Sequence, residues 1–273
     1  MCNIRDNLRN AKRIVIKVGT STLTYDTGKI NFTRIDKLAR VMSDLANQGK
    51  DVVLVSSGAI GVGVGKLKLK GKPKTVREKQ AIAAVGQCEL MHMYSKFFSD
   101  YGRIVGQILL TRDVVEDDIR RKNVINTFEN LLERGIIPIV NENDSVAVEE
   151  IEFGDNDTLS AIVAQLVGAD LLIILSDIDG FYNGDPKKNT GLKLISVIEQ
   201  ITPALEKYAG GPGTKRGTGG MATKLLAAKI ATAAGVDMVI SNGINPEVIM
   251  DIMEGKDVGT LFVSNKRSGS SGQ

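Results

Sequence analysis

A glycine-rich stretch that also carries lysine and arginine is one candidate in this chain for a site of chemistry. Residues 210–224 read GGPGTKRGTGGMATK and include Lys215, Arg216 and Lys224. Directly behind them, Met221 to Ala234 is rich in alanine and other good helix formers. Glycine lets a backbone approach a ligand closely, and the first N–H groups of a helix attract anions because they lack partners inside it. Taken alone, this pattern fits a phosphate site and an ordinary surface loop before a core helix equally well.

Lys17 is a second cation in an unusual setting. It lies inside the apolar run Arg13 to Val18, which reads RIVIKV. Lysine is rarely buried without a partner, so this side chain either extends to water at the end of a strand or carries a charge into a cleft. We favour the cleft, because Gly19 follows closely and leaves space for a ligand.

Carboxylates that could serve these lysines occur at the start of a predicted helix, Asp155 to Leu166. The segment before it reads Gly154-Asp155-Asn156-Asp157. One Asp or Asn is enough to cap a helix. The remaining carboxylates are therefore free to orient lysines or to hold a metal ion.

The elements that must position these residues alternate between strand and helix along nearly the whole chain. The predicted strands are continuous apolar runs, as expected for parallel strands that are covered on both faces. The sequence therefore predicts an α/β fold with an open, doubly wound, mainly parallel sheet between helices. The predicted strands are 13–18, 51–55, 104–110, 136–140, 171–175, 237–240 and 260–263, and the predicted helices are 31–48, 75–98, 123–134, 155–166, 221–234 and 246–253.

Polar or glycine residues follow four of these strands at their carboxyl ends, where open α/β sheets bind ligands. The segments are KVGTS at 17–21, SSGAIG at 56–61, NEND at 141–144 and SDIDG at 176–180. Ordinary turn chemistry explains any one of them, but it explains four together less well. We therefore expect one binding site that spans several strand ends.

Composition and motifs exclude several classes of protein. The chain of 273 residues has a net charge of only +3 and lacks a basic run with interleaved aromatics, so no nucleic-acid partner is expected. No apolar run approaches the ~20 residues that span a membrane, and the amino-terminal residues contain no secretory signal. Cys2 and Cys88 form no metal-binding pattern and suggest reduced thiols in a cytoplasmic protein.

Two familiar nucleotide motifs are also missing. No G-x-G-x-x-G follows a strand, and Lys224 is followed by Leu225 rather than by Ser or Thr, so neither a dinucleotide fold nor a P-loop is supported. The only histidine, His92, lies in a predicted helix and is interpreted as structural. Catalysis or zinc binding through histidine is therefore disfavoured.

Several segments, taken in order, resemble those of one known family. They are VIKVGTS, VSSGAIGVG, AAVGQ, GQILLT, IVNENDSV, FGDNDTLSA, LLIILSDIDGFY with a following DP, and GTGGMATKLLAA. Together they resemble the glutamate 5-kinases of the amino acid kinase superfamily, over about Arg13 to Val263. The resemblance implies a single amino acid kinase domain at 1–265, with a substrate half at about 13–170 and a nucleotide half at about 171–265. Residues 266–273 are expected to be a disordered tail, and the chain is similar to the short form without a C-terminal PUA domain.

The resemblance also implies an activity: ATP-dependent phosphorylation of the γ-carboxylate of L-glutamate to glutamyl 5-phosphate, the first step toward proline. ATP and Mg²⁺ are the implied cofactors, and a homo-oligomer, either dimer or tetramer, is the implied assembly. Two alternatives stay open. One is an amino acid kinase that acts on aspartate, acetylglutamate or UMP, which the NEND and GDND segments disfavour. The other is a non-catalytic sensor of the same fold, which the presence of both Lys17 and Lys224 disfavours.

The family's site residues carry over to matching positions. By this resemblance Lys17 and Lys224 contact the phosphates and Asp157 holds both lysines, so these three form the catalytic set. The implied substrate-binding residues are Ser57, Gly58, Ala59, Asp144 and Asn156. The implied ATP-binding residues are Lys17, Gly19, Thr20, Ser176, Asp177, Thr218, Gly219, Gly220, Met221, Ala222, Thr223 and Lys224. No protein ligand is assigned to the metal, which ATP phosphates and water are expected to coordinate.

Overall fold

A computed structural model describes residues 4–25, 29–71, 73–146, 156–184, 191–209 and 220–265. In this part of the chain the strands are β1 (Arg13–Val18), β2 (Asp51–Ser56), β3 (Val105–Leu110), β4 (Ile137–Glu142), β5 (Leu171–Ser176), β6 (Val197–Ile198), β7 (Asp237–Asn242) and β8 (Thr260–Phe262). The helices are the 3₁₀ helix η1 (Ile4–Asn10) and α1 (Thr20–Leu23), α2 (Phe32–Asn47), α3 (Ala59–Lys66), α4 (Val76–Ser99), α5 (Arg112–Glu116), α6 (Asp118–Glu133), α7 (Asn156–Leu166), α8 (Pro203–Tyr208), α9 (Met221–Ala233) and α10 (Val248–Met253).

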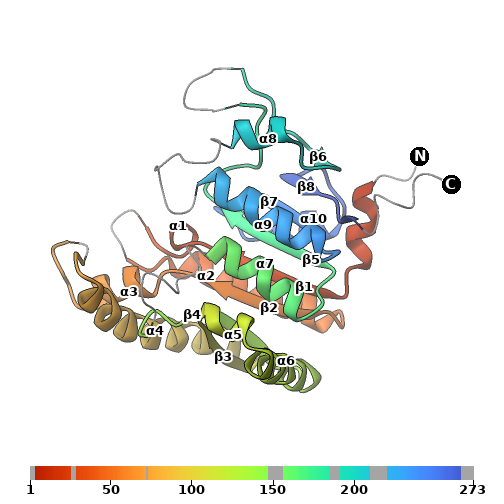
Figure 1. The fold of residues 1–273 in the computed structure, drawn as a ribbon. Helices are drawn as coiled ribbons and strands as arrows, with labels where there is room; N and C mark the ends of the chain where they lie inside the picture. Colours follow the sequence, from red (N-terminus) through yellow and green to blue (C-terminus); the bar gives the residue numbers. More distant parts are fainter. Residues whose placement is uncertain are drawn as a thin grey trace.

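The strands of the described residues form one eight-stranded sheet in the order β3-β4-β2-β1-β5-β7-β8-β6 (Figure 1). All neighbouring strands are parallel except β7 and β8. Val18 of β1 lies opposite Ser56 of β2 and Leu175 of β5, so the central strands end level with one another. The predicted mainly parallel sheet is confirmed, and its carboxyl ends meet along one edge.

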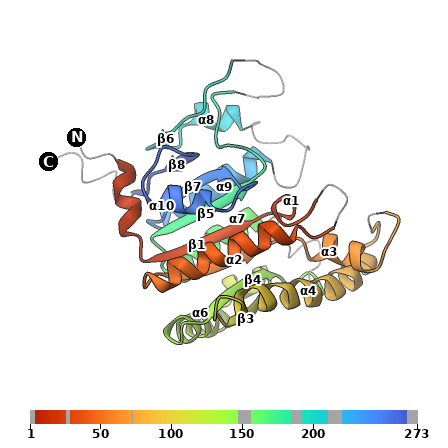
Figure 2. The same ribbon diagram turned by 180° about the vertical axis from the view of Figure 1, so that it is seen from behind.

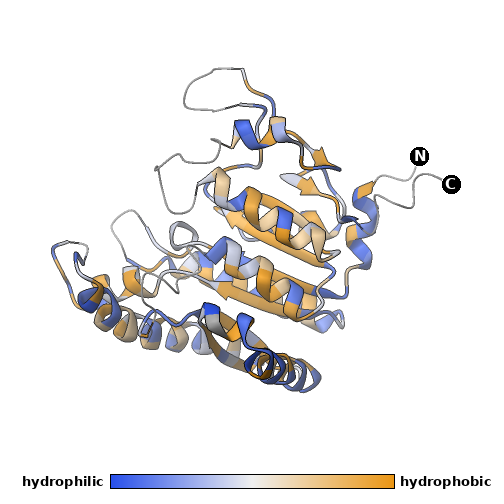
Figure 3. Cartoon of the chain, viewed as in Figure 1, coloured by the Kyte–Doolittle hydropathy of each residue, from blue (hydrophilic) through white to orange (hydrophobic). Residues whose placement is uncertain are grey.

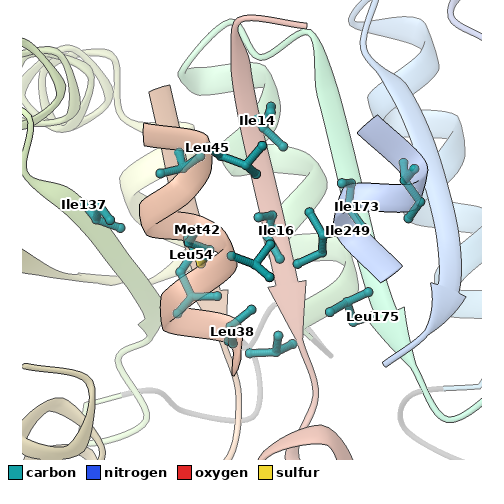
Figure 4. Packing of buried hydrophobic residues seen from close by; sticks show 14 of the residues in the cluster. Ile14, Ile16, Leu38, Met42, Leu45, Leu54, Ile137, Ile173, Leu175 and Ile249 are labelled. Atoms are coloured by element: carbon teal, nitrogen blue, oxygen red, sulfur yellow. The ribbon is translucent and has the colours of Figure 1, made fainter. Parts of the chain in front are cut away.

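Helices cover both faces of the sheet (Figures 1 and 2). Ile14 and Ile16 of β1 pack in the hydrophobic cluster that contains residues of α2 and α10, whereas Val15 packs on the opposite side with residues of α7 and α9. Figure 4 shows Leu38, Met42 and Leu45 of α2 lying over the first of these faces. The strands are apolar nearly throughout (Figure 3), because both of their faces are buried.

The glycine-rich segment after β2 forms a helix, α3, that the sequence did not predict. Glycine at 61, 63 and 65 makes this helix unfavourable by itself. Packing against α4 compensates, because the two backbones touch. A Cβ at Gly86 would lie 1.7 Å from the carbonyl oxygen of Ala59, and a Cβ at Gly63 would lie 2.2 Å from that of Ile82.

Other differences from the sequence prediction are small. α6 begins at Asp118 rather than at residue 123, because the side chain of Asp117 accepts a hydrogen bond from the Arg120 amide and caps it earlier. The short elements η1, α1, α5, β6 and α8 were not predicted. The division into substrate and nucleotide halves stays a prediction, and the tail at 266–273 lies outside the described residues.

Arg5 links η1 to the residues just before β6 and β8. Its side chain is buried and donates hydrogen bonds to four backbone carbonyls, those of Ser196, Lys256, Val258 and Gly259, at 2.8–3.3 Å. The beginning of the described chain is thereby held beside β8. None of the helices that the structure describes is long and apolar enough to cross a membrane.

Candidate active site

A cavity of about 500 Å³ opens at the carboxyl ends of the central strands. Because those ends are level, the loops after β1, β2, β4 and β5 reach the cavity together. Its wall is mainly polar and glycine residues. It consists of Lys17, Gly19, Thr20, Ser21, Ser57, Gly58, Ala59, Ile60, Gly61, Asn141, Asp144, Asn156, Asp157, Leu175, Ser176, Asp177 and Lys224.

Asp157 lies between two lysines in this cavity. Its Oδ1 is 2.6 Å from the Lys17 ammonium nitrogen, and its Oδ2 is 3.0 Å from that of Lys224. All three side chains are buried in the protein. Two ammonium groups and one carboxylate leave a net charge of +1, so the cluster attracts an anion that enters the cavity.

The fold explains how these residues meet. Lys17 lies two positions after Val15, so its side chain leaves β1 on the face covered by α7 and α9. Asp157 is in the first turn of α7, and Lys224 is in the first turn of α9. A Cβ at position 19 would lie 3.7 Å from the Lys17 ammonium nitrogen, in van der Waals contact, so glycine leaves that side of the nitrogen uncovered.

The protonation of Asp157 is set by two opposing effects. Burial alone would raise the pKa of this carboxyl, but the charges and hydrogen bonds of Lys17 and Lys224 outweigh it and hold the pKa below its usual value of 3.8. The carboxylate is therefore ionised at neutral pH. It can orient both ammonium groups, because each of its two oxygens contacts one of them.

Two helices that begin near the cavity, α3 and α9, lack the side-chain caps that several other helices have. The N-caps of α3 and α9 are Gly58 and Gly220, and neither has a side chain to satisfy the first amides. By contrast, α2, α4, α6 and α8 are capped by the side chains of Asn31, Thr75, Asp117 and Thr202. Uncapped amides at α3 and α9 remain available to an anion.

Gly58 also has a backbone conformation that suits few other residues. Its φ of 103° is in the left-handed region, which an L side chain disfavours. This conformation turns the chain sharply from β2 into α3. The amides at the start of α3 therefore lie at the cavity, where residues 58–61 form part of the wall.

The far wall of the cavity carries a second polar group of side chains. The Ser176 hydroxyl donates a hydrogen bond to the Asp177 carboxylate at 3.0 Å. Just beyond the cavity wall, Asp179 accepts hydrogen bonds from Asn242 at 2.8 Å and from Tyr182 at 3.0 Å. These contacts fix the loop after β5.

The structure brings most of the predicted site residues to this one cavity. Among the described residues, four predicted site residues are not on the cavity wall: Gly220, Met221, Ala222 and Thr223. The Met221 side chain packs against the hydrophobic cluster that includes residues of α9, and the Thr223 hydroxyl donates a hydrogen bond to the Gly220 carbonyl. Thr218 and Gly219 lie outside the described residues. Five wall residues, Ser21, Ile60, Gly61, Asn141 and Leu175, received no individual role from the sequence. The first four lie in the segments 17–21, 56–61 and 141–144, which were expected to contribute to one binding site, whereas Leu175 was predicted only as the end of a strand.

Metal binding by protein side chains alone finds no support in the described ranges. No group of three or more His, Cys, Asp or Glu side chains within them could hold an ion. The carboxylates on the cavity wall come from separate parts of the chain: Asp144 follows β4, Asp157 is in the first turn of α7, and Asp177 follows β5.

Comparison with known proteins places the whole chain among phosphotransferases. A model described as the amino acid kinase family matches residues 12–242. A glutamate 5-kinase from Clostridium perfringens is 61% identical over 267 residues, which cover 96% of this chain and 99% of that protein. One from Listeria innocua is also 61% identical, covering 96% and 97%, and one from Clostridium tetani is 56% identical, covering 95% and 97%.

Solved structures with low sequence identity share the fold. A carbamate kinase from Giardia lamblia bound to AMP-PNP matches with a TM-score of 0.67 at 18% identity, covering 94% of this chain and all of that one. A UMP kinase from Bacillus anthracis matches with a TM-score of 0.63 at 18% identity, covering 93% and 97%. At this identity the likeness concerns architecture alone.

Proposed function

The chain belongs to the amino acid kinase family, among its glutamate 5-kinases, and from this premise we propose how its cavity carries out the reaction. The enzyme transfers the γ-phosphoryl group of ATP to the γ-carboxylate of L-glutamate. The products are ADP and glutamyl 5-phosphate, the first intermediate of proline biosynthesis. Assembly as a dimer or tetramer and a cytoplasmic location stay predictions.

The mechanism rests on one observation: the ammonium groups of Lys17 and Lys224 both contact the Asp157 carboxylate. Phosphoryl transfer depends mainly on positioning and on neutralising charge. Lys17 and Lys224 direct two ammonium groups toward one point, because each is fixed at one oxygen of the same carboxylate. We assign both lysines to the transferring phosphoryl group and Asp157 to holding their direction.

The acceptor needs no general base. A carboxylate is already ionised at neutral pH, so one of its oxygens can attack the γ-phosphorus directly. A new oxygen–phosphorus bond forms as the bond to the β-phosphate oxygen breaks, and the electron pair leaves with ADP. No proton moves in this step, which agrees with the position of His92 on the exposed side of α4.

Glutamate is assigned to the side of the cavity formed by the loops after β2 and β4. Asp144 offers a carboxylate to the substrate ammonium group, and Asn156, on the same cavity wall, offers its amide oxygen. Ser57 and the amides of Gly58 and Ala59, at the start of α3, suit the substrate's carboxylates.

ATP is assigned to the opposite side, with Gly19, Thr20, Ser176 and Asp177 on the cavity wall. The start of α9 supplies further amides from residues 220–224. The two lysines and the uncapped helix ends fit a triphosphate, and the scattered carboxylates fit a metal ion held mainly by phosphate oxygens and water. When bound, Mg²⁺ would neutralise phosphate charge.

The activity is tested with the purified chain, ATP, Mg²⁺ and hydroxylamine, which traps an acyl phosphate as a hydroxamate. We expect hydroxamate and ADP to form in equal amounts and only when glutamate is present. Aspartate, acetylglutamate and UMP serve as alternative acceptors in the same assay. Faster turnover with any of them would show that the assignment of glutamate is wrong.

A further inference from the structure

A chain of hydrogen-bonded carboxamides connects α4 to the glutamate side of the cavity. The Asn141 amide nitrogen donates to Gln87 Oε1 at 2.9 Å, and the Asn156 amide nitrogen donates to Asn141 Oδ1 at 2.9 Å. Gln87 and Asn141 are both buried. Asn141 and Asn156 are on the cavity wall, whereas Gln87 is behind it. The hydrogen bonds that connect Gln87 to the cavity therefore pass through the two asparagines.

Backbone groups determine which way each asparagine amide faces. The Asn156 amide nitrogen also donates to the Ser56 carbonyl at 2.8 Å, and a carbonyl can only accept. The Glu142 amide donates to Asn141 Oδ1 at 2.9 Å, and an N–H can only donate. These contacts therefore determine which atom of each asparagine carboxamide is the nitrogen and which is the oxygen.

The orientation leaves one kind of atom for the ligand. Both hydrogens of the Asn156 amide nitrogen are used, one by Ser56 and one by Asn141. Only its carbonyl oxygen, Oδ1, remains to meet a molecule in the cavity, and this atom accepts hydrogen bonds. On the same cavity wall as Asp144, it suits the ammonium group of an amino acid and offers nothing to a carboxylate.

We propose that Gln87 is a positioning residue that fixes the Asn156 carboxamide through Asn141, and so makes this wall of the cavity selective for a substrate with an ammonium group. The proposal rests on the proposed function, since it concerns how that site distinguishes glutamate from similar dicarboxylates. Without the Gln87 acceptor, the buried Asn141 amide nitrogen loses its partner. Asn141 then rotates toward another acceptor, and the Asn156 amide is released to turn its donor into the cavity.

The test replaces Gln87 with an apolar side chain of similar length. Gln87→Met should raise KM for glutamate roughly tenfold, the upper range for one hydrogen bond, while kcat and KM for ATP stay within about twofold. Gln87→Glu keeps an acceptor oxygen toward Asn141 and should restore KM to near the wild-type value. Lys96→Met, at an exposed position of the same helix, is the matched control and should change none of these constants.

Glutarate provides a readout that a general loss of packing would not give. It is glutamate without the ammonium group, so it makes no use of Asn156 Oδ1. Its inhibition constant against glutamate should change less than about threefold in Gln87→Met, although KM for glutamate rises. Circular dichroism confirms folding, and Gln87→Leu carries the same test if the methionine variant does not fold.

Three results would overturn the inference. They are an unchanged KM for glutamate in a folded apolar variant, a parallel rise in the glutarate inhibition constant, and failure of Gln87→Glu to restore KM. Each of these results can be interpreted only if the wild-type enzyme phosphorylates glutamate. A wild-type protein without glutamate-dependent turnover would instead refute the proposed function, and this inference with it.

Discussion

Lys17 and Lys224 come from opposite ends of the chain, yet their ammonium nitrogens lie 2.6 and 3.0 Å from the two oxygens of one buried carboxylate. Each lysine is therefore held by the same group but from a different element, β1 in one case and α9 in the other. Because the carboxylate belongs to α7, three elements fix the geometry of the charges. The consequences can be measured separately for each residue.

Replacing either lysine should slow the chemical step. Lys17→Ala and Lys224→Ala should each lower kcat by about 10²–10³, because a preorganised donor to the transition state is lost. The double variant should lose less than the product of the two factors, since groups that act together are not additive. Steady-state kinetics with circular dichroism on each variant provide the measurement. Near-normal kcat in folded Lys224→Ala would show that Lys224 of α9 does not act at the phosphate site.

The charge on Asp157 should stabilise the fold above acid pH. Asp157→Asn leaves two buried ammonium groups without their carboxylate and should cost about 3 kcal/mol at pH 7. The pKa of Asp157 is lowered below 3.8, so its contribution is complete above that value and is lost as the pH falls through the lowered pKa. Urea unfolding of both proteins between pH 7 and pH 3 should show a constant difference that narrows below about pH 4. A difference that grows toward acid pH would contradict this assignment.

Asp144 should act on glutamate binding rather than on the chemistry. Asp144→Ala should raise KM for glutamate by about 10- to 100-fold, because the substrate ammonium loses a charged hydrogen-bond partner. KM for ATP should change little. Asp100→Ala, on the exposed end of α4, is the control for removal of an acidic side chain. An unchanged KM for glutamate would show that Asp144 does not bind the substrate.

The contact between α3 and α4 should not tolerate even one added carbon. In Gly86→Ala the new Cβ meets the Ala59 carbonyl at 1.7 Å, so α3 must move away from α4. We expect a loss of about 1–3 kcal/mol in stability and a higher KM for glutamate, because the start of α3 lies at the cavity. Gly71→Ala is the matched control, since a Cβ there meets nothing within 4 Å. Equal melting temperatures for the two variants would show that α3 is free to shift.

Most of the fold could be predicted from the sequence, because the strands are apolar runs with clear boundaries. α3 could not, since its glycines have low helix propensity and the helix depends on a backbone contact with α4. The 3₁₀ helix at 4–10 depends likewise on distant carbonyls that receive Arg5. Both elements exist through tertiary contacts that no local pattern encodes.

The candidate site was predictable where its residues lie at or just after the ends of strands. Lys17 and Ser176 are near or at the ends of β1 and β5, Ser57 and Asp144 come just after β2 and β4, and all four lie on the cavity wall. Gln87 was not identified, because a single glutamine in a long helix has no distinguishing spacing. Its partner, Asn141, is 54 positions away, and only the folded chain brings the two amides together.

The clamp formed by Arg5 has a consequence for synthesis on the ribosome. Its carbonyl partners belong to residues 196, 256, 258 and 259, so η1 gains most of these contacts only after nearly all of the described chain has been translated. A nascent chain that ends before Lys256 already contains every wall residue of the cavity but lacks three of the four carbonyls that receive Arg5. Limited proteolysis should therefore cleave such a truncated chain within residues 4–10, whereas the full chain resists. Completion of the last strand thus acts as the closing step in the maturation of this kinase.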